Sequence, residues 1–146
     1  MKKYPLIYLS STSYHWWNFV SKNWKKNIIK EFKISKFKNV NYIDPLVYKS
    51  EDPKVCPLDI RDILKSDYII VYLDKITIGT MLELGFCLFK KNINKKFYVL
   101  SFNKNVVNHP WIQYLCKYNI ATSYKECVDR IYLDWTERYV YTKTKK

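Results

Sequence analysis

Apolar residues recur along this chain in two alternating periods, which predict strands and helices in turn. Short apolar runs predict five strands, at residues 4–10, 40–43, 68–73, 97–102 and 119–122. Helical spacing or helix-start signals predict helices at residues 16–32, 57–65, 80–91, 111–116 and 124–138. The run from Tyr68 to Leu73 is almost continuously apolar, which is typical of a strand that is buried on both faces.

The first predicted helix shows the helical period most clearly. Its largest apolar residues recur three or four positions apart, at Trp17, Val20, Trp24, Ile28 and Phe32. These residues would form one stripe, which we expect to pack against the sheet.

Strands and helices that alternate over 146 residues predict an α/β fold with a doubly wound, flavodoxin- or Rossmann-like parallel sheet. We expect one domain over residues 1–146, strand order 2-1-3-4-5 and helices on both faces, with 139–146 as a basic, frayed tail. With that order the direction of winding changes between the first and third strands, and ligands bind outside the carboxyl ends of those strands. Those ends carry Ser10 to Ser13 and Asp74 to Thr80.

The chain contains only two glycines, Gly79 and Gly85, and they lie on either side of Glu83. Gly79 would supply a positive φ or allow a ligand to approach the main chain closely. Gly85 lies inside a predicted helix, where glycine costs roughly 1 kcal/mol relative to alanine. We therefore expect close packing at Gly85.

Two interpretations of Glu83 remain open from the residues alone. Thr80 and Glu83 have the spacing of a capping box, in which Glu83 would bond the Thr80 amide at the start of the helix. Alternatively, a carboxylate ionised at a helix N-terminus can attack the anomeric carbon of a sugar and form a covalent intermediate. Ser10 to Ser13 are similarly open: they could cap the following helix or bind a substrate.

The formal net charge of +13 comes mainly from lysine, since only Arg61, Arg130 and Arg138 among the 26 basic residues are arginine. Lysine-rich segments attract anions, including nucleotides. No helix-turn-helix, RNA-recognition or zinc-finger pattern accompanies the charge, so we do not predict nucleic-acid binding as the main role.

We expect a cytoplasmic protein with no metal or other cofactor. There is no run of 18 apolar residues and no apolar signal-peptide core at the start. Cys87 and Cys116 lie in apolar segments and resemble buried free thiols more than disulfide or zinc partners. The two histidines, His15 and His109, show no metal-ligand spacing.

Three segments in order carry a resemblance to a known family. They are Ile7-Tyr8-Leu9-Ser10, then Asp59 eight residues before Asp67, and then Ile78-Gly79-Thr80-x-x-Glu83-Leu84-Gly85. Together they resemble the nucleoside 2-deoxyribosyltransferases, a family that includes relatives hydrolysing 2′-deoxynucleoside 5′-monophosphates. The resemblance covers about residues 4 to 102, and the Gly-Thr-x-x-Glu-Leu-Gly block is its most specific part.

The resemblance implies a role for each matching residue. Glu83 matches the glutamate that attacks C1′ of the deoxyribose, and Tyr8 matches a tyrosine that helps to hold it. Asp59 matches an aspartate near sugar and base that is a candidate proton donor to the leaving base. Asp67 matches a structural aspartate, and Gly79 and Thr80 would line the substrate site.

The sequence departs from the family pattern at two places. Many transferases have a base-contacting aspartate where this chain has Thr77, and the nearest carboxylate is Asp74. The first loop, with Ser10, Ser11, Thr12 and Ser13, is instead similar to the hydrolase branch, where Thr12 falls at the place of a phosphate-binding serine.

Three functions therefore remain open. The first is transfer of deoxyribose from a 2′-deoxynucleoside to a free nucleobase. The second is hydrolysis of a 2′-deoxynucleoside 5′-monophosphate, and the third is nucleotide binding without catalysis. The resemblance also implies a homo-oligomer, at least a dimer, with sites near the interface. Base preference and oligomer size stay open.

Overall fold

The computed structural model of the chain describes residues 4–10, 18–37, 39–45, 56–74, 78–90 and 96–143. For residues 18–22 and 139–143 only the backbone is described.

Five parallel strands form one sheet. They are β1 (Leu6–Ser10), β2 (Asn41–Ile43), β3 (Tyr68–Tyr72), β4 (Phe97–Leu100) and β5 (Ile120–Ala121). Their order across the sheet is β2-β1-β3-β4-β5, and every neighbouring pair is parallel. The predicted fold class and strand order are therefore confirmed. Ser10 pairs with Val71 at the carboxyl ends of β1 and β3, where the winding changes direction.

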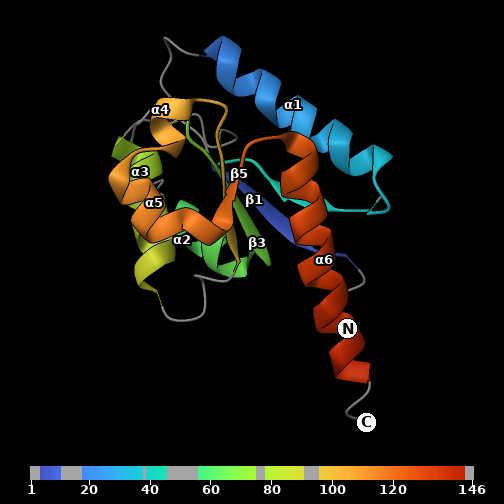
Figure 1. Cartoon of the computed structure of the whole chain (residues 1–146). Coiled ribbons are helices and arrows are strands. Elements are labelled where there is room, and N and C mark those ends of the chain that lie inside the picture. The colour runs from blue at the N-terminus through green and yellow to red at the C-terminus, as the bar shows by residue number, and fades with distance from the viewer. Residues whose placement is uncertain are drawn as a thin grey trace.

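Helices cover both faces of the sheet (Figure 1). The helices are α1 (Asn18–Ile34), α2 (Cys56–Lys65), α3 (Ile78–Phe89), α4 (Lys104–Val107), α5 (Pro110–Cys116) and α6 (Tyr124–Lys143), with a 3₁₀ turn, η4 (Lys117–Asn119). Side chains from α1 and α6 share one core cluster with the sheet, and those from α2, α3, α4 and α5 share another. The molecule is thus a three-layer α/β sandwich.

The pleat of the strands divides the core into these two clusters. Ile7 and Leu9 of β1 face α1 and α6, whereas Tyr8 belongs to the cluster with α2 and α3. Trp24, Ile28 and Phe32 of α1 are almost completely buried, as their spacing predicts. Trp17 lies outside the described residues, as does the side chain of Val20.

Several boundaries differ from the predicted ones. α3 begins at Ile78 and not at Thr80, and β4 ends at Leu100 and not at Phe102. The short helix α4 was not predicted; it begins after Asn103, whose side chain accepts a hydrogen bond from the Asn105 amide. α6 continues to Lys143, so the predicted frayed tail is wrong for residues 139–143, which are helical.

Asp67 has the structural role that was expected of it. Its carboxylate accepts a hydrogen bond from the Leu6 amide at 2.9 Å, and its own amide donates to the Leu6 carbonyl at 2.8 Å. The two bonds fix the start of β3 against β1. None of the helices in the described ranges is long and apolar enough to cross a membrane.

Candidate active site

Glu83 lies where β1 meets α3, and side chains from β1 hold both of its oxygens. The Tyr8 hydroxyl donates to Oε1 at 3.1 Å, and the Ser10 hydroxyl donates to Oε2. Tyr8 and Ser10 are two residues apart on β1, so the pleat points both toward α3. The carboxylate is therefore oriented by two donors at the carboxyl end of the first strand.

The capping-box interpretation of Glu83 is wrong. Thr80 is the third residue of α3 and is buried, so it is not the N-cap. The glutamate side chain extends to the strand instead of back to the start of its own helix. Its two partners are more than seventy positions away in the sequence, which is a tertiary arrangement and not a local helix signal.

Opposing effects act on the pKa of Glu83. Burial raises it above its ordinary value of 4.5, because a carboxylate loses hydration inside the protein. The hydrogen bonds from Ser10 and Tyr8 favour the ionised form and partly offset the burial. Burial, with the negative charge of Glu83, also raises the pKa of Tyr8 far above its usual range, so the phenol remains a donor.

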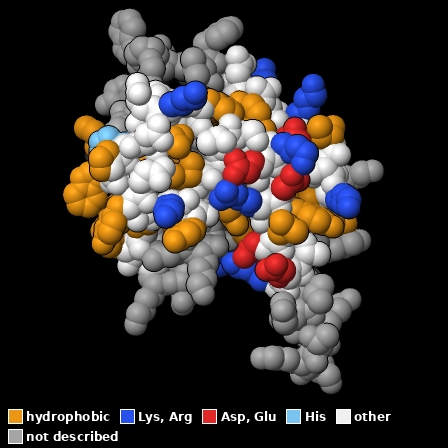
Figure 2. All heavy atoms as spheres, in the orientation of Figure 1, with side chains coloured by type: hydrophobic (Ala, Val, Ile, Leu, Met, Phe, Trp, Pro, Cys, Tyr) orange, Lys and Arg blue, Asp and Glu red, His pale blue; other side chains and the backbone are white. Residues whose placement is uncertain are grey.

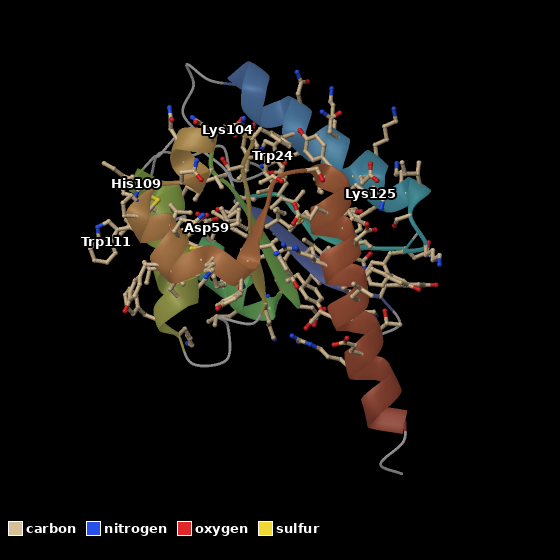
Figure 3. All side chains as sticks on the ribbon, in the orientation of Figure 1. Trp24, Asp59, Lys104, His109, Trp111 and Lys125 are labelled. Carbon is tan, nitrogen blue, oxygen red and sulfur yellow. The ribbon has the colours of Figure 1, made fainter. Side chains whose placement is uncertain are left out.

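Asp59, labelled in Figure 3, lies on α2, and its charge acts on both Tyr8 and Glu83. Its buried Oδ1 atom has no hydrogen-bond partner among the described residues. Burial raises the pKa of Asp59, and the buried carboxylate of Asp62, one turn along α2, raises it further. These effects favour a protonated acid with a free hydrogen-bonding atom, which suits a proton donor.

Lys25 is a buried cation near the same edge of the sheet. It lies on α1, is 5% exposed, and its Nζ atom is 2.5 Å from Asp44 Oδ1, just after β2. Its charge also reaches Glu83 and favours the ionised carboxylate. Burying an ammonium group carries a large desolvation penalty, which makes this lysine a candidate functional residue.

The carboxylate of Asp74 is occupied by hydrogen bonds from within the protein. Its carboxylate accepts hydrogen bonds from the Tyr72 hydroxyl, from the Phe102 amide at 2.9 Å and from the Ser101 hydroxyl at 3.4 Å. Tyr72 belongs to the cluster on the α1 and α6 side of the sheet. These bonds connect Asp74 to the segment after β4, and its predicted role in substrate binding stays a prediction.

The structure contradicts one prediction for each glycine. Gly79 is helical and does not have a positive φ, so that prediction is wrong. The space around it is open, and a close approach by a ligand there stays a prediction. Gly85 also faces open space, so the close packing expected within the chain is wrong too.

Four of the remaining predicted site residues lie outside the described part of the chain: Ser11, Thr12, Ser13 and Thr77. Their predicted contacts with substrate stay predictions. In the described ranges, no group of three or more His, Cys, Asp or Glu side chains is placed to hold a metal ion.

Sequence reasoning missed three features of the site. Ser10 was predicted to bind substrate, whereas it bonds the glutamate directly. Lys25 follows Trp24 and lies three residues before Ile28, so it borders the apolar stripe of α1, a signal that could have been noticed. Asp62 follows Asp59 at helical spacing, which could have indicated a carboxylate pair on one face of α2.

Comparisons with known proteins support the fold assignment and name no function. No protein-family model matches the chain, and no curated protein matches its sequence. Among solved structures, the chain is similar to one described as the crystal structure of a conserved protein from Enterococcus faecalis V583, with a TM-score of 0.61 and 15% sequence identity. The match covers 90% of this chain and 99% of that one. At this identity the likeness shows a shared fold.

Proposed function

We propose that this chain cleaves the N-glycosidic bond of 2′-deoxynucleosides and passes the deoxyribose to another nucleobase, with Glu83 as the nucleophile. The observation that supports this most is the Glu83 carboxylate held by Tyr8 and Ser10 at the switch point of the sheet. Beside it lies Asp59, whose environment favours the proton. A nucleophilic carboxylate and a carboxyl group that can donate a proton form the pair that glycosidic cleavage requires.

The reaction has two balanced steps. The bond between C1′ and the base nitrogen breaks as Asp59 gives its proton to the departing base, and one oxygen of Glu83 forms an ester with C1′. A nitrogen of a second base then attacks C1′, the ester bond breaks, and the carboxylate of Glu83 is restored. The proton lost by the incoming base returns to Asp59.

Tyr8 and Ser10 orient the attacking carboxylate. Because each donates to a different oxygen, they limit rotation of the carboxylate about its last bond. The same bonds weaken the nucleophile slightly, but they also favour its ionised form and so act against the effect of burial. They stabilise the glutamate again when it leaves C1′ as an anion.

The alternative acceptor is water, which would make the chain a 2′-deoxynucleoside 5′-monophosphate N-glycosidase. Lys25 supports this candidate, because a buried cation close to Glu83 would favour an anionic substrate. We also propose that the protein acts in the cytoplasm, where free thiols such as those of Cys87 and Cys116 persist. A non-catalytic nucleotide-binding module is the third proposal.

One incubation series separates these functions. The protein is mixed with a 2′-deoxynucleoside or its 5′-monophosphate, each with and without a second free base, and the products are separated by chromatography. Exchange of bases on the unphosphorylated nucleoside supports the transferase. Base release that requires the phosphate supports the hydrolase, and saturable binding without turnover supports the binding module.

The matched variants are Glu83→Gln and Glu137→Gln, the second changing an exposed glutamate on α6. We expect the first to abolish cleavage and the second to leave it unchanged. Turnover by Glu83→Gln near the unmodified rate would exclude Glu83 as the nucleophile.

A further inference from the structure

The outer side of α5 and of the turn η4 carries three exposed aromatic rings, which we call the α5 aromatic face. Trp111 is 67% exposed, Tyr114 82% and Tyr118 83%. Trp111 and Tyr114 lie three positions apart on one side of α5, and their ring centroids are 6.5 Å apart at an angle of 83°. Figure 3 shows Trp111 pointing outward from α5. Ile112 and Cys116, on the other side of the helix, are buried in the core. The helix thus presents its rings to solvent.

Tertiary hydrogen bonds fix the backbone that carries the α5 aromatic face. The Gln113 side chain donates to the Val107 carbonyl of α4 at 2.7 Å, which ties α5 to the helix before it. At the other end, the Arg130 side chain of α6 donates to the Tyr118 carbonyl at 3.1 Å. The rings are therefore mounted on a backbone that is already ordered, which reduces the entropy lost when a ligand binds.

The charge around this face has one sign. The sequence from Leu84 to Lys125 contains no aspartate or glutamate, although the whole chain has 13 of them. The same run contains seven lysines: Lys90, Lys91, Lys95, Lys96, Lys104, Lys117 and Lys125. Lys104 on α4 and Lys117 in η4 are exposed, and Lys117 Nζ lies 5.6 Å from the centre of the Tyr118 ring. This part of the surface should attract a polyanion.

The carboxylates at the two ends of this run are bonded within the chain. Glu83 accepts hydrogen bonds from Tyr8 and Ser10, and Glu126 pairs with Arg130 at 2.6 Å. In the view of Figure 2, orange and blue side chains lie over α4 and α5 on the left of the molecule, whereas the red carboxylates gather over α6. The positive charge beside the rings is therefore not cancelled locally.

Exposed rings beside lysines fit single-stranded nucleic acid best. Its unstacked bases present flat faces that stack on aromatic side chains, and its phosphates are attracted to lysine. In a duplex the bases already stack on one another, so rings on a protein surface cannot reach their faces. A helix that lies in a lipid surface is commonly about 20–30 residues long, whereas α5 has seven. An acidic protein would match the lysines but offers few flat partners for three rings.

We propose that the α5 aromatic face binds single-stranded nucleic acid, with bases stacked on Trp111, Tyr114 and Tyr118 and phosphates beside Lys104 and Lys117. The site takes DNA or RNA, because every base has a flat face. It requires none of the motifs of folded nucleic-acid-binding domains, since a few rings and lysines suffice. This role stands beside the reaction proposed for Glu83 and does not depend on it.

Fluorescence anisotropy of the full chain with a fluorescein-labelled oligothymidylate of about 12 nucleotides tests the proposal. We expect saturable binding at low salt. Trp111→Ala and Tyr114→Ala should each weaken the affinity about tenfold, because each variant loses one stacking ring. Leu133→Ala is the matched control, since Leu133 is exposed on α6 and lies outside the face; it should bind like the unmodified chain. Circular dichroism confirms that each variant is folded.

The salt dependence of the same binding tests the lysines. With single strands, the slope of log affinity against log salt changes by about 0.7 for each phosphate that the protein neutralises. Lys104→Gln and Lys117→Gln should each make the slope shallower by about that amount. Lys125→Gln is the matched control, because Lys125 pairs with Asp129 at 2.5 Å and Figure 3 shows it on the opposite side of the view from Trp111. Its slope should be unchanged.

An oligouridylate and a duplex of the same length complete the series. Binding of either single strand supports the proposal, and the comparison between them shows whether DNA or RNA is preferred. The proposal is overturned by a lack of saturable binding at low salt, by a duplex that binds as tightly as the single strand, or by full affinity in both ring variants.

Two other occupants of the face would also overturn the proposal. Anionic phospholipid vesicles that bind through Trp111 and Tyr114, while the oligonucleotides do not, would assign the face to a lipid surface. A dimer that Trp111→Ala dissociates, again without oligonucleotide binding, would assign it to a second copy. Turnover enters none of these measurements, so a failure of the proposed reaction leaves their outcome unaffected.

Discussion

At the scale of single residues, the ionised form of Glu83 that the proposed reaction needs is also the form that lowers folding stability. Its pKa is raised in the folded chain, so the folded state binds this proton more tightly than the unfolded state does. That contribution to stability is complete below pH 4.5 and is lost as the pH rises through the folded pKa. Above the folded pKa the ionised, buried carboxylate therefore lowers the stability of the fold.

Glu83→Gln should remove this destabilising effect. We expect the variant to have a larger free energy of unfolding than the unmodified chain at pH 7, and the advantage should shrink as the pH falls toward 4.5. Urea unfolding followed at several pH values measures it. Glu137→Gln is the control on an exposed position, and a difference that does not change with pH would contradict the burial of an ionised Glu83.

Asp62 should determine the protonation of Asp59. Its buried negative charge raises the pKa of Asp59, in addition to the effect of burial. In Asp62→Asn the pKa of Asp59 falls, so the loss of base release at alkaline pH should begin at a lower pH. A pH–rate profile measures the change, with Asp129→Asn on the exposed side of α6 as the control. An alkaline limb that does not move would show that Asp59 is not the acid.

At the scale of elements, Asp74 connects the end of β3 to the segment that follows β4. Its carboxylate receives hydrogen bonds from Tyr72, Phe102 and Ser101, and its carbonyl receives one from the Asn103 side chain at 3.1 Å. Asp74→Asn cannot accept all of these bonds, and it should lower the free energy of unfolding by about 1–3 kcal/mol. Urea unfolding of this variant measures the loss, with Asp129→Asn as the control. A change in substrate affinity with unaltered stability would instead support the predicted role in binding.

The elements were largely predictable because they depend on local patterns. The apolar run at β3 and the stripe through Trp24, Ile28 and Phe32 are consequences of burial, and burial follows the periodicity of a strand or a helix. α4 was not predictable in this way, because its four residues include only one buried side chain, Val106.

The arrangement around Glu83 could be predicted only in part. Its place beside the end of β1 followed from the strand order, and its partner Tyr8 followed from the resemblance. The choice between a helix cap and a bond to the strand depends on contacts between residues 75 and 73 positions apart, which no local pattern encodes. The same is true of Lys25, whose burial depends on where Asp44 lies at the end of β2.

At the scale of the whole molecule, the net charge of +13 should make stability depend on salt. Folding brings these cations closer together, and dissolved ions reduce their repulsion over a screening length of about 8 Å at physiological ionic strength. We expect the midpoint of thermal unfolding to rise as potassium chloride is increased from a few millimolar to that level. A midpoint that falls or stays constant would show that the described ion pairs outweigh the net repulsion.

The distribution of thiols makes the chain suitable for selective chemical labelling. Burial raises the pKa of Cys87 to about 12, of Cys116 to about 11 and of Cys127 to about 12, and the thiolate is the form that reacts. Cys56 is exposed and is the first residue of α2, one turn before Asp59. A maleimide dye should therefore attach once to the folded chain and at all four cysteines after unfolding. Under the proposed function, its fluorescence would report nucleoside binding without any engineered cysteine.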